Sequence, residues 1–143
     1  MLELSRDLAD GAHPYLVTPQ HTAEARLLHG EGPLLAVEQA VAPTDNREEA
    51  LRLARSHLSR YMPMPNYRSS WLRQGFREED LSGEGSERLP NGLVAWRSED
   101  DIRGRVREHL SAGSDQVCVQ LLTDGRADDL GGMWRSLAPV LLG

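Results

Sequence analysis

Lysine is absent from this sequence of 143 residues, and all 16 basic residues are arginines. This absence excludes a Schiff-base lysine and the lysine of a phosphate-binding P-loop. The single cysteine, Cys118, excludes an internal disulfide and a cysteine-rich zinc site. Apolar runs are short, as at residues 34–37, so we expect no membrane-spanning segment.

The composition that is present is typical of one folded domain. A hydrophobic fraction of 39% is too high for a disordered chain, and the length suits one domain rather than two. The net charge of -6 argues against general nucleic-acid binding. Because no charged and then apolar leader opens the sequence, we expect no secretion signal and a reducing, cytoplasmic setting.

Hydrophobic spacing alternates between helical and strand periods along the chain. The expected strands cover residues 13–17, 34–42 and 116–123, and the expected helices cover 1–9, 19–29, 45–62, 66–72, 98–112 and 130–142. Residues 63–97 are expected to form an insertion after the second strand, with a loop-like stretch marked by Gly83, Gly85, Pro90 and Gly92. Strands that alternate with amphipathic helices predict an α/β fold with a parallel sheet.

Three sets of residues have the spacing of helix starts. Thr18 before Pro19 is typical of a capped first turn. Asp45 with Glu48, and Ser98 with Asp101, have the spacing of a capping box.

Two polar residues, Glu38 and Gln39, interrupt the apolar second strand. Strand alternation places one on each face of the sheet. A buried polar side chain costs free energy unless it is paired, so each either meets a partner in a neighbouring helix or belongs to a site. We take both as candidate substrate-pocket residues.

A second polar group follows the long central helix, where Asn66, Tyr67 and Arg68 lie together. An amide, a phenol and a guanidinium in this position are expected to line a substrate pocket, with Arg68 binding an anion. The alternative is an ordinary packed insertion.

The remaining reactive side chains give weaker signals. No histidine pair has the spacing of a helical metal site, and we expect no metal ligands. His57 and His109 are expected on solvated helix faces, and Cys118 is expected to be a buried, inert thiol. His13 differs because it lies where a strand meets a loop. No residue is assigned a catalytic role.

Several segments spaced along the chain carry a recognisable pattern: DGAHPYLVTP (10–19), HTAEAR (21–26), PNYR (65–68), LVAW (93–96), VREHL (106–110), AG (112–113) and VCVQ (117–120). Together they resemble the luciferase-like monooxygenase superfamily, in particular the actinobacterial branch that uses coenzyme F420.

This resemblance implies a (β/α)8 TIM barrel that transfers hydride between a deazaflavin or flavin and an organic substrate. The chain matches only the C-terminal part of that barrel, so residues 1–143 are expected to be one partial barrel domain with strands six to eight. His13, at the exit of the sixth strand, is the expected cofactor-binding residue. The cofactor is expected to be coenzyme F420, or alternatively FMN, and not to be bound by this chain alone.

Three functions follow as hypotheses. The chain is the C-terminal part of such an oxidoreductase and needs the missing N-terminal half. Alternatively, it is a non-catalytic remnant or ligand-binding module that self-associates through unpaired sheet edges. An unrelated small α/β binding module is the third possibility.

Overall fold

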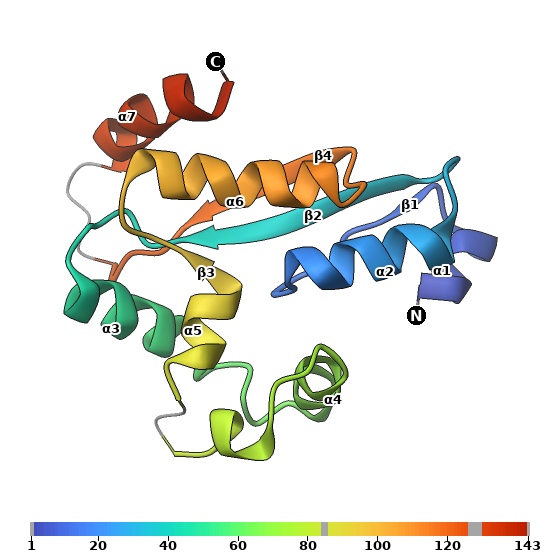
Figure 1. The fold of residues 1–143 in the computed structure, drawn as a ribbon, viewed down its shortest axis with the longest axis horizontal. Coiled ribbons are helices and arrows are strands. Elements are labelled where there is room, and N and C mark those ends of the chain that lie inside the picture. The colour runs from blue at the N-terminus through green and yellow to red at the C-terminus, as the bar shows by residue number, and fades with distance from the viewer. Residues whose placement is uncertain (1, 84–85, 126–129, 143) are drawn as a thin grey trace.

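The computed structural model describes residues 2–83, 86–125 and 130–142, which form parallel strands flanked by helices (Figure 1). The strands are β1 (Gly11–Ala12), β2 (Leu34–Val41), β3 (Val94–Ala95) and β4 (Gln116–Leu121). The helices are α1 (Leu2–Leu8), α2 (Pro19–His29), α3 (Arg47–Leu58), α4 (Pro65–Arg73), α5 (Arg88–Leu93), α6 (Glu99–Ser111) and α7 (Leu130–Leu142), with a 3₁₀ helix η1 (Glu78–Leu81). The expected α/β class with a parallel sheet is confirmed.

Strand β2 lies at the centre of the sheet and pairs with the other three strands. The backbone N–H of Glu38 donates to Pro14, just after β1, and that of Ala42 donates to Ala95 in β3. On the opposite edge, the N–H of Leu122 donates to Val41. Because backbone groups alternate along a strand, β1 and β3 share one edge of β2 and β4 occupies the other.

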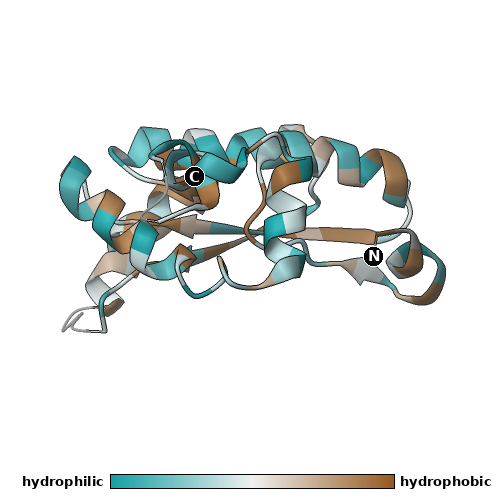
Figure 2. Ribbon diagram, turned by 90° about the horizontal axis from the view of Figure 1, so that it is seen from below, coloured by the Kyte–Doolittle hydropathy of each residue, from teal (hydrophilic) through white to brown (hydrophobic). Residues whose placement is uncertain are grey.

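The odd-numbered and the even-numbered side chains of β2 face two different layers of the fold. Val37 packs with α2, and Val41 packs with α6 and α7, so the odd-numbered side chains face one helical layer. Figure 2 shows this row of helices on one side of the sheet. The even-numbered side chains face the other side, where Ala40 and Ala42 enter a separate cluster.

That second cluster is built from α3, α4, η1 and α5, which cover the carboxyl ends of the strands. Trp71 of α4 is fully buried in it, and its indole N–H donates to the carbonyl of Leu16 at 3.1 Å. The excursion between β2 and α6 was expected over residues 63–97. In the structure α3 packs with α5 in the same cluster, so the excursion includes α3 as well.

Local signals predicted several helix boundaries. Thr18 caps α2, and Ser98 and Asp101 form the expected capping box of α6. The cap of α3 is Asn46, whose side chain accepts from the N–H of Glu49, so the prediction that Asp45 is the cap was wrong by one residue.

Two further expectations differ from the structure. The first strand was expected over residues 13–17, but the regular pairing covers Gly11–Ala12, since Pro14 has no N–H to continue it. The stretch that contains Pro90 and Gly92 was expected to be loop-like, but residues 88–93 form α5 with both of them inside the helix. Tertiary packing of Leu89 and Leu93, both fully buried, outweighs the weak helix propensity of Pro90 and Gly92.

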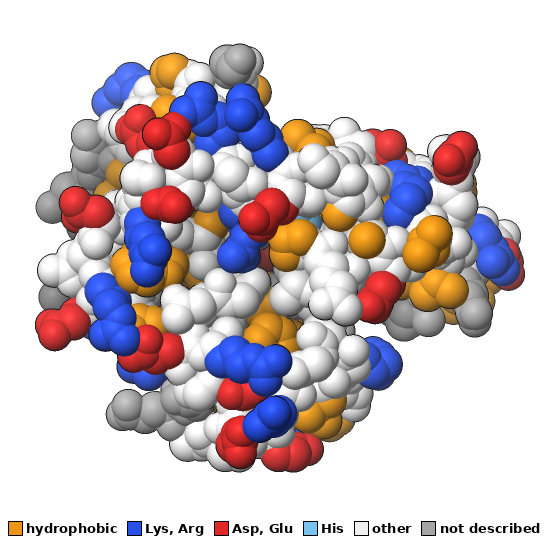
Figure 3. Space-filling model, in the orientation of Figure 1, with side chains coloured by type: hydrophobic (Ala, Val, Ile, Leu, Met, Phe, Trp, Pro, Cys, Tyr) orange, Lys and Arg blue, Asp and Glu red, His pale blue; other side chains and the backbone are white. Residues whose placement is uncertain are grey.

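The surface carries mixed charge. On the face shown in Figure 3, acidic and arginine side chains are interspersed rather than gathered by sign. In the described part of the chain, no helix is both long and apolar enough to cross a membrane.

Candidate functional site

Polar and aromatic side chains meet on the even-numbered face of the sheet, near the carboxyl ends of the strands. We call them the Tyr15 cluster; its members are Tyr15, Glu38, His57, Tyr61, Tyr67 and Gln120. They come from the segment after β1, from β2 and β4, and from the α3–α4 region. In parallel α/β folds, this end of the sheet is where ligands bind.

The phenol of Tyr15 is the centre of the hydrogen bonds. It donates to the side-chain oxygen Oε1 of Gln120 at 2.8 Å. Its oxygen lies 3.1 Å from the hydroxyl of Tyr61 and 3.2 Å from Nε2 of His57. Because the Tyr15 proton is used for Gln120, Tyr61 and His57 are the donors in this arrangement.

The aromatic rings pack in tilted and edge-on pairs. Ring centroids are 5.5 Å apart for Tyr15 and Tyr61, 4.8 Å for Tyr61 and Tyr67, and 5.9 Å for Tyr67 and Trp71. Such pairs add about 0.5–1.5 kcal/mol each beyond area burial. The rings therefore form a continuous packed row that holds the Tyr15 ring, and with it the Tyr15 hydroxyl, in position.

Glu38 is the most unusual member, because only 4% of it is exposed. Its Oε2 accepts from the backbone N–H of Leu16 at 3.2 Å, whereas Oε1 has no partner among the described residues. Burial raises the pKa of Glu38 to about 7, and the Leu16 N–H opposes this shift. The carboxyl group is therefore able to hold or release a proton near neutral pH.

Burial favours the neutral forms of three other members, Tyr15, Tyr67 and His57. Burial raises the pKa of the Tyr15 phenol, helped by the Tyr61 hydrogen bond and the Glu38 charge. Burial also raises the pKa of Tyr67 and lowers the pKa of His57, with Arg60 adding to the latter shift. His57 is only 8% exposed, so the prediction that it lies on a solvated face was wrong.

His13, the expected cofactor-binding residue, lies beside this face and contacts β2. Its Nδ1 is 2.7 Å from the carbonyl of Ala36, which accepts the bond. In a regular parallel ladder, the backbone N–H of residue 14 would donate to the Ala36 carbonyl, but proline has no N–H. The ring thus replaces a missing backbone donor while the side chain stays exposed.

Gln39 faces the opposite layer, as alternation predicts, and its partners are all buried. Its Oε1 accepts from Nε2 of His109 at 3.0 Å, and its amide N–H donates to the carbonyl of Leu93 at 3.1 Å. Nδ1 of His109 then accepts from Thr22 at 2.8 Å. His109 is fully buried, which corrects its expected solvated position, and burial lowers its pKa to about 4.

The other expected pocket residues are divided. Tyr67 joins Glu38 in the Tyr15 cluster. Arg68, on the next position of α4, points to the η1 segment, where it pairs with Glu78 and donates to the carbonyl of Leu81 at 3.1 Å. Asn66 is exposed. Sequence patterns therefore found two of the six cluster members.

The cluster members that were not among the predicted pocket residues are Tyr15, His57, Tyr61 and Gln120. Gln120 had a usable signal, because it is a polar residue within an apolar strand, as Glu38 is. His57 and Tyr61 had the four-residue spacing of one helix face. Cys118 pairs in register with Glu38 and is partly exposed, so it is not the buried thiol that was expected.

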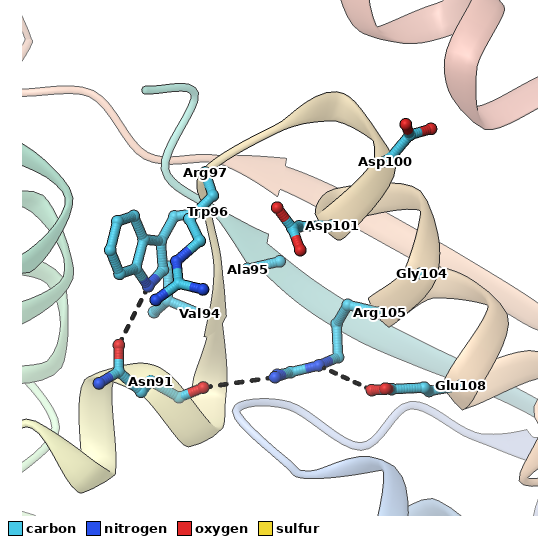
Figure 4. Close-up of a pocket in the computed structure, with 10 residues that line it drawn as sticks. All are labelled: Asn91, Val94, Ala95, Trp96, Arg97, Asp100, Asp101, Gly104, Arg105 and Glu108. Atoms are coloured by element: carbon cyan, nitrogen blue, oxygen red, sulfur yellow. Dashed lines mark hydrogen bonds and ion pairs between the residues drawn. The ribbon is translucent and has the colours of Figure 1, made fainter. Parts of the chain in front are cut away.

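A separate hollow of about 500 Å³ lies between α5–β3 and α6 (Figure 4). Arg105 crosses one end of it and donates to the carbonyls of Asn91 and Gly92, while Arg97 lies over the Trp96 ring at 4.9 Å. Asp100, Asp101 and Glu108 line α6 beside these arginines. The mixed charge points to no particular ligand.

Comparisons with known proteins give no relative: no family model, no curated protein and no solved structure matches the chain. Among the described residues, no group of three or more potential metal-ligating side chains is close enough to hold an ion.

Proposed function

We propose that this chain supplies strands six to eight of a (β/α)8 barrel of the luciferase-like monooxygenase superfamily. The barrel would be an oxidoreductase that transfers hydride between coenzyme F420, or FMN, and an organic substrate. The Tyr15 cluster is the observation that carries the proposal. Polar side chains from neighbouring parallel strands gather at the carboxyl ends of those strands, on the side away from α2 and α6.

Strand order supports the barrel part of the proposal. β1, β2 and β4 are parallel neighbours in chain order, and α2 and α6 connect them along one face of the sheet. This is the repeating unit of a (β/α)8 barrel, in which the other face of the sheet points to the barrel interior. On this interpretation, the Tyr15 cluster lies at the interior mouth and the α3–α5 segment covers it.

The cluster fits one part of the proposed cofactor. Tyr15, Tyr61 and Tyr67 offer aromatic surfaces for a planar ring, and Gln120 offers an amide group at its edge. The anionic tail has no matching cation within the cluster, because the nearby Arg68 is paired with Glu78. We therefore assign the ring contacts to this chain and the tail contacts to the strands that complete the barrel.

Glu38 is the residue of this chain that we assign to proton handling. When bound, the deazaflavin or flavin supplies the hydride. Reduction of a carbonyl or imine carbon by hydride also requires a proton at the neighbouring oxygen or nitrogen, and a carboxyl group with a pKa near 7 is matched to that task. The Tyr15 hydroxyl, held by three partners, fixes the geometry next to it.

Fluorescence titration with coenzyme F420 and with FMN tests the proposal. We expect no saturable micromolar binding by the 143-residue chain alone. Binding should appear after addition of a polypeptide that supplies the five missing βα units. Tyr67→Leu should then weaken it, while Trp134→Leu, an exposed aromatic position outside the cluster, should not.

Two results would count against the proposal. Tight binding by the chain alone contradicts the need for a second half. Failure to bind either cofactor after complementation, with both halves shown to associate, contradicts the assignment to this superfamily.

A second candidate function is a non-catalytic, self-associating ligand-binding module. The outer edge of β4, which pairs with no strand in the described part of the chain, favours it, because such an edge recruits further strands. A chain that keeps its fold and binds neither cofactor, with or without the added half, would support this alternative.

A further inference from the structure

The outer edge of β4 presents backbone groups that have no strand partner among the described residues. Leu122 donates to Val41 of β2, so the even-numbered residues of β4 direct their backbone groups toward β2. Val117, Val119 and Leu121 therefore direct theirs outward. Within the described ranges 2–83, 86–125 and 130–142, no other strand pairs with this edge.

The edge also lacks the features that usually prevent strand pairing. The six residues Gln116–Leu121 contain no charged residue and no proline. Natural edge strands are commonly protected by lysines, prolines, bulges or covering elements. Gln116 is exposed, the other five residues are partly buried and none is fully buried, so every residue of the strand keeps some exposure to solvent.

The sequence of this edge matches itself in reverse. Residues 116–120 read QVCVQ, which is symmetric about Cys118. In an antiparallel pair related by a twofold axis at Cys118, each side chain faces its own kind. Gln116 lies opposite Gln120 of the second copy, and Val117 lies opposite Val119 of the second copy.

We propose that β4 is a dimer interface, in which the β4 strands of two copies pair antiparallel about a twofold axis at Cys118. Such a contact is isologous and closes at two copies. We take a second copy of this chain as the partner of this edge, because the edge is self-complementary in sequence and in the alternation of its backbone groups.

The side chains support this register. On the sheet face of the Tyr15 cluster, the Oε1 of Gln120 accepts from Tyr15, which leaves the Gln120 amide N–H groups to donate to Gln116 of the second copy. On the other face, branched valines meet across the strands, a favourable cross-strand pair. Asp115 then lies opposite Leu121 of the second copy, so no acidic residue faces another directly.

The backbone groups of Cys118 point toward β2, so Cys118 would form a non-hydrogen-bonded pair with Cys118 of the second copy. Cα atoms in such pairs are about 4.5 Å apart, within the range that a disulfide spans. The only thiol in the chain therefore reports on the register.

The proposal does not depend on the redox function, although a barrel-completing half would compete for the same edge. Light scattering after size exclusion should show twice the 15.9 kDa chain mass over a millimolar-to-micromolar dilution series. Mild oxidation with diamide should convert the dimer to a Cys118–Cys118 cross-linked species. The Cys118→Ser variant should remain dimeric without cross-linking.

Val119→Pro removes an outward N–H and leaves the β2 ladder intact, so it should give a folded monomer by circular dichroism. Val119→Thr, which keeps the branched shape and the N–H, is the matched control and should remain dimeric. A Gln116→Cys variant in the Cys118→Ser background should not cross-link, because the two new thiols lie four positions out of register.

Three outcomes would overturn the proposal. These are a monomer at millimolar concentration, a dimer that persists in folded Val119→Pro, and cross-linking of Gln116→Cys at the rate of Cys118. Cofactor titration plays no part in this test, so the proposed function and the dimer can fail separately.

Discussion

The carboxylate oxygen Oε2 of Glu38 lies 3.2 Å from the backbone nitrogen of Leu16 and accepts its N–H. Leu16 has a φ of 54°, in the left-handed region that non-glycine residues adopt infrequently. Its carbonyl accepts from Trp71, so two side chains hold both backbone groups of this turn. The turn positions Tyr15 and leaves the Glu38 carboxyl group buried, with no partner for Oε1 among the described residues.

Glu38 should make stability fall as the pH rises toward neutrality. Its pKa is about 7 in the folded state, against the ordinary value of 4.5, so between these values the folded state holds a proton that the unfolded state has lost. The free energy of unfolding should decrease over this range by about 3 kcal/mol. Urea denaturation of Glu38→Gln between pH 4.5 and 8 should show that this dependence is gone.

The exposed Glu31→Gln is the matched control and should leave the pH profile unchanged. A Glu38→Gln profile parallel to that of the wild type would mean that Glu38 ionises as an exposed carboxyl group does.

The parts of the fold that depend on local spacing were predictable. The cap at Thr18 and the box at Ser98 satisfy orphan N–H groups within a few residues, so the sequence alone contains the information. The polar residues Glu38 and Gln39 also pointed to opposite faces, because strand alternation is strictly local.

Contacts between residues that are far apart in the sequence were not predictable. His109 is surrounded in sequence by charged residues, yet Gln39 and Thr22 bury it through bonds that cross 70 and 87 residues. Gln120, one partner of the Tyr15 hydroxyl, is 105 residues away in the sequence. Such contacts depend on which strands become neighbours, which no spacing rule reveals.

His109 should make the folded state less stable as the pH falls below 6.5, whereas Glu38 makes it less stable as the pH rises. Its pKa is about 4 in the folded state against the ordinary 6.5, so below pH 6.5 the unfolded state takes up a proton that the folded state refuses. Stability should decrease by about 3 kcal/mol as the pH falls from 6.5 to 4. The His109→Gln variant should be destabilised at neutral pH and should lose this acid dependence in denaturant titrations.

Thr22→Val separates the loss of a buried hydrogen bond from the loss of the titrating imidazole. It removes the hydroxyl that donates to His109 but keeps the imidazole, so it should cost about 1–3 kcal/mol and retain the acid dependence. If Thr22→Val and His109→Gln give the same pH profile, the His109 imidazole is not the cause of the acid dependence.

His13 and Pro14 should be coupled in their effect on stability. His13→Ala removes the donor to the Ala36 carbonyl and should cost about 1 kcal/mol. In a Pro14→Ala background the backbone N–H returns to that position, so the same His13→Ala change should cost much less. A double-mutant cycle by urea denaturation measures the difference, and additive effects would show that the ring does not replace the missing backbone bond.

Gly92 and Gly104 provide a matched pair for steric effects inside helices. A Cβ at position 92 would lie 2.7 Å from Cζ of the buried Phe76, whereas a Cβ at position 104 meets no atom within 4 Å. Neither glycine has a positive φ, so the comparison isolates packing from backbone strain. Gly92→Ala should destabilise by about 1–3 kcal/mol through overpacking. Gly104→Ala should stabilise by about 0.5–1 kcal/mol, because alanine loses less conformational entropy on folding. Phe76→Leu combined with Gly92→Ala should restore part of the loss, and equal thermal stability of the two single variants would contradict the close packing of α5 on Phe76.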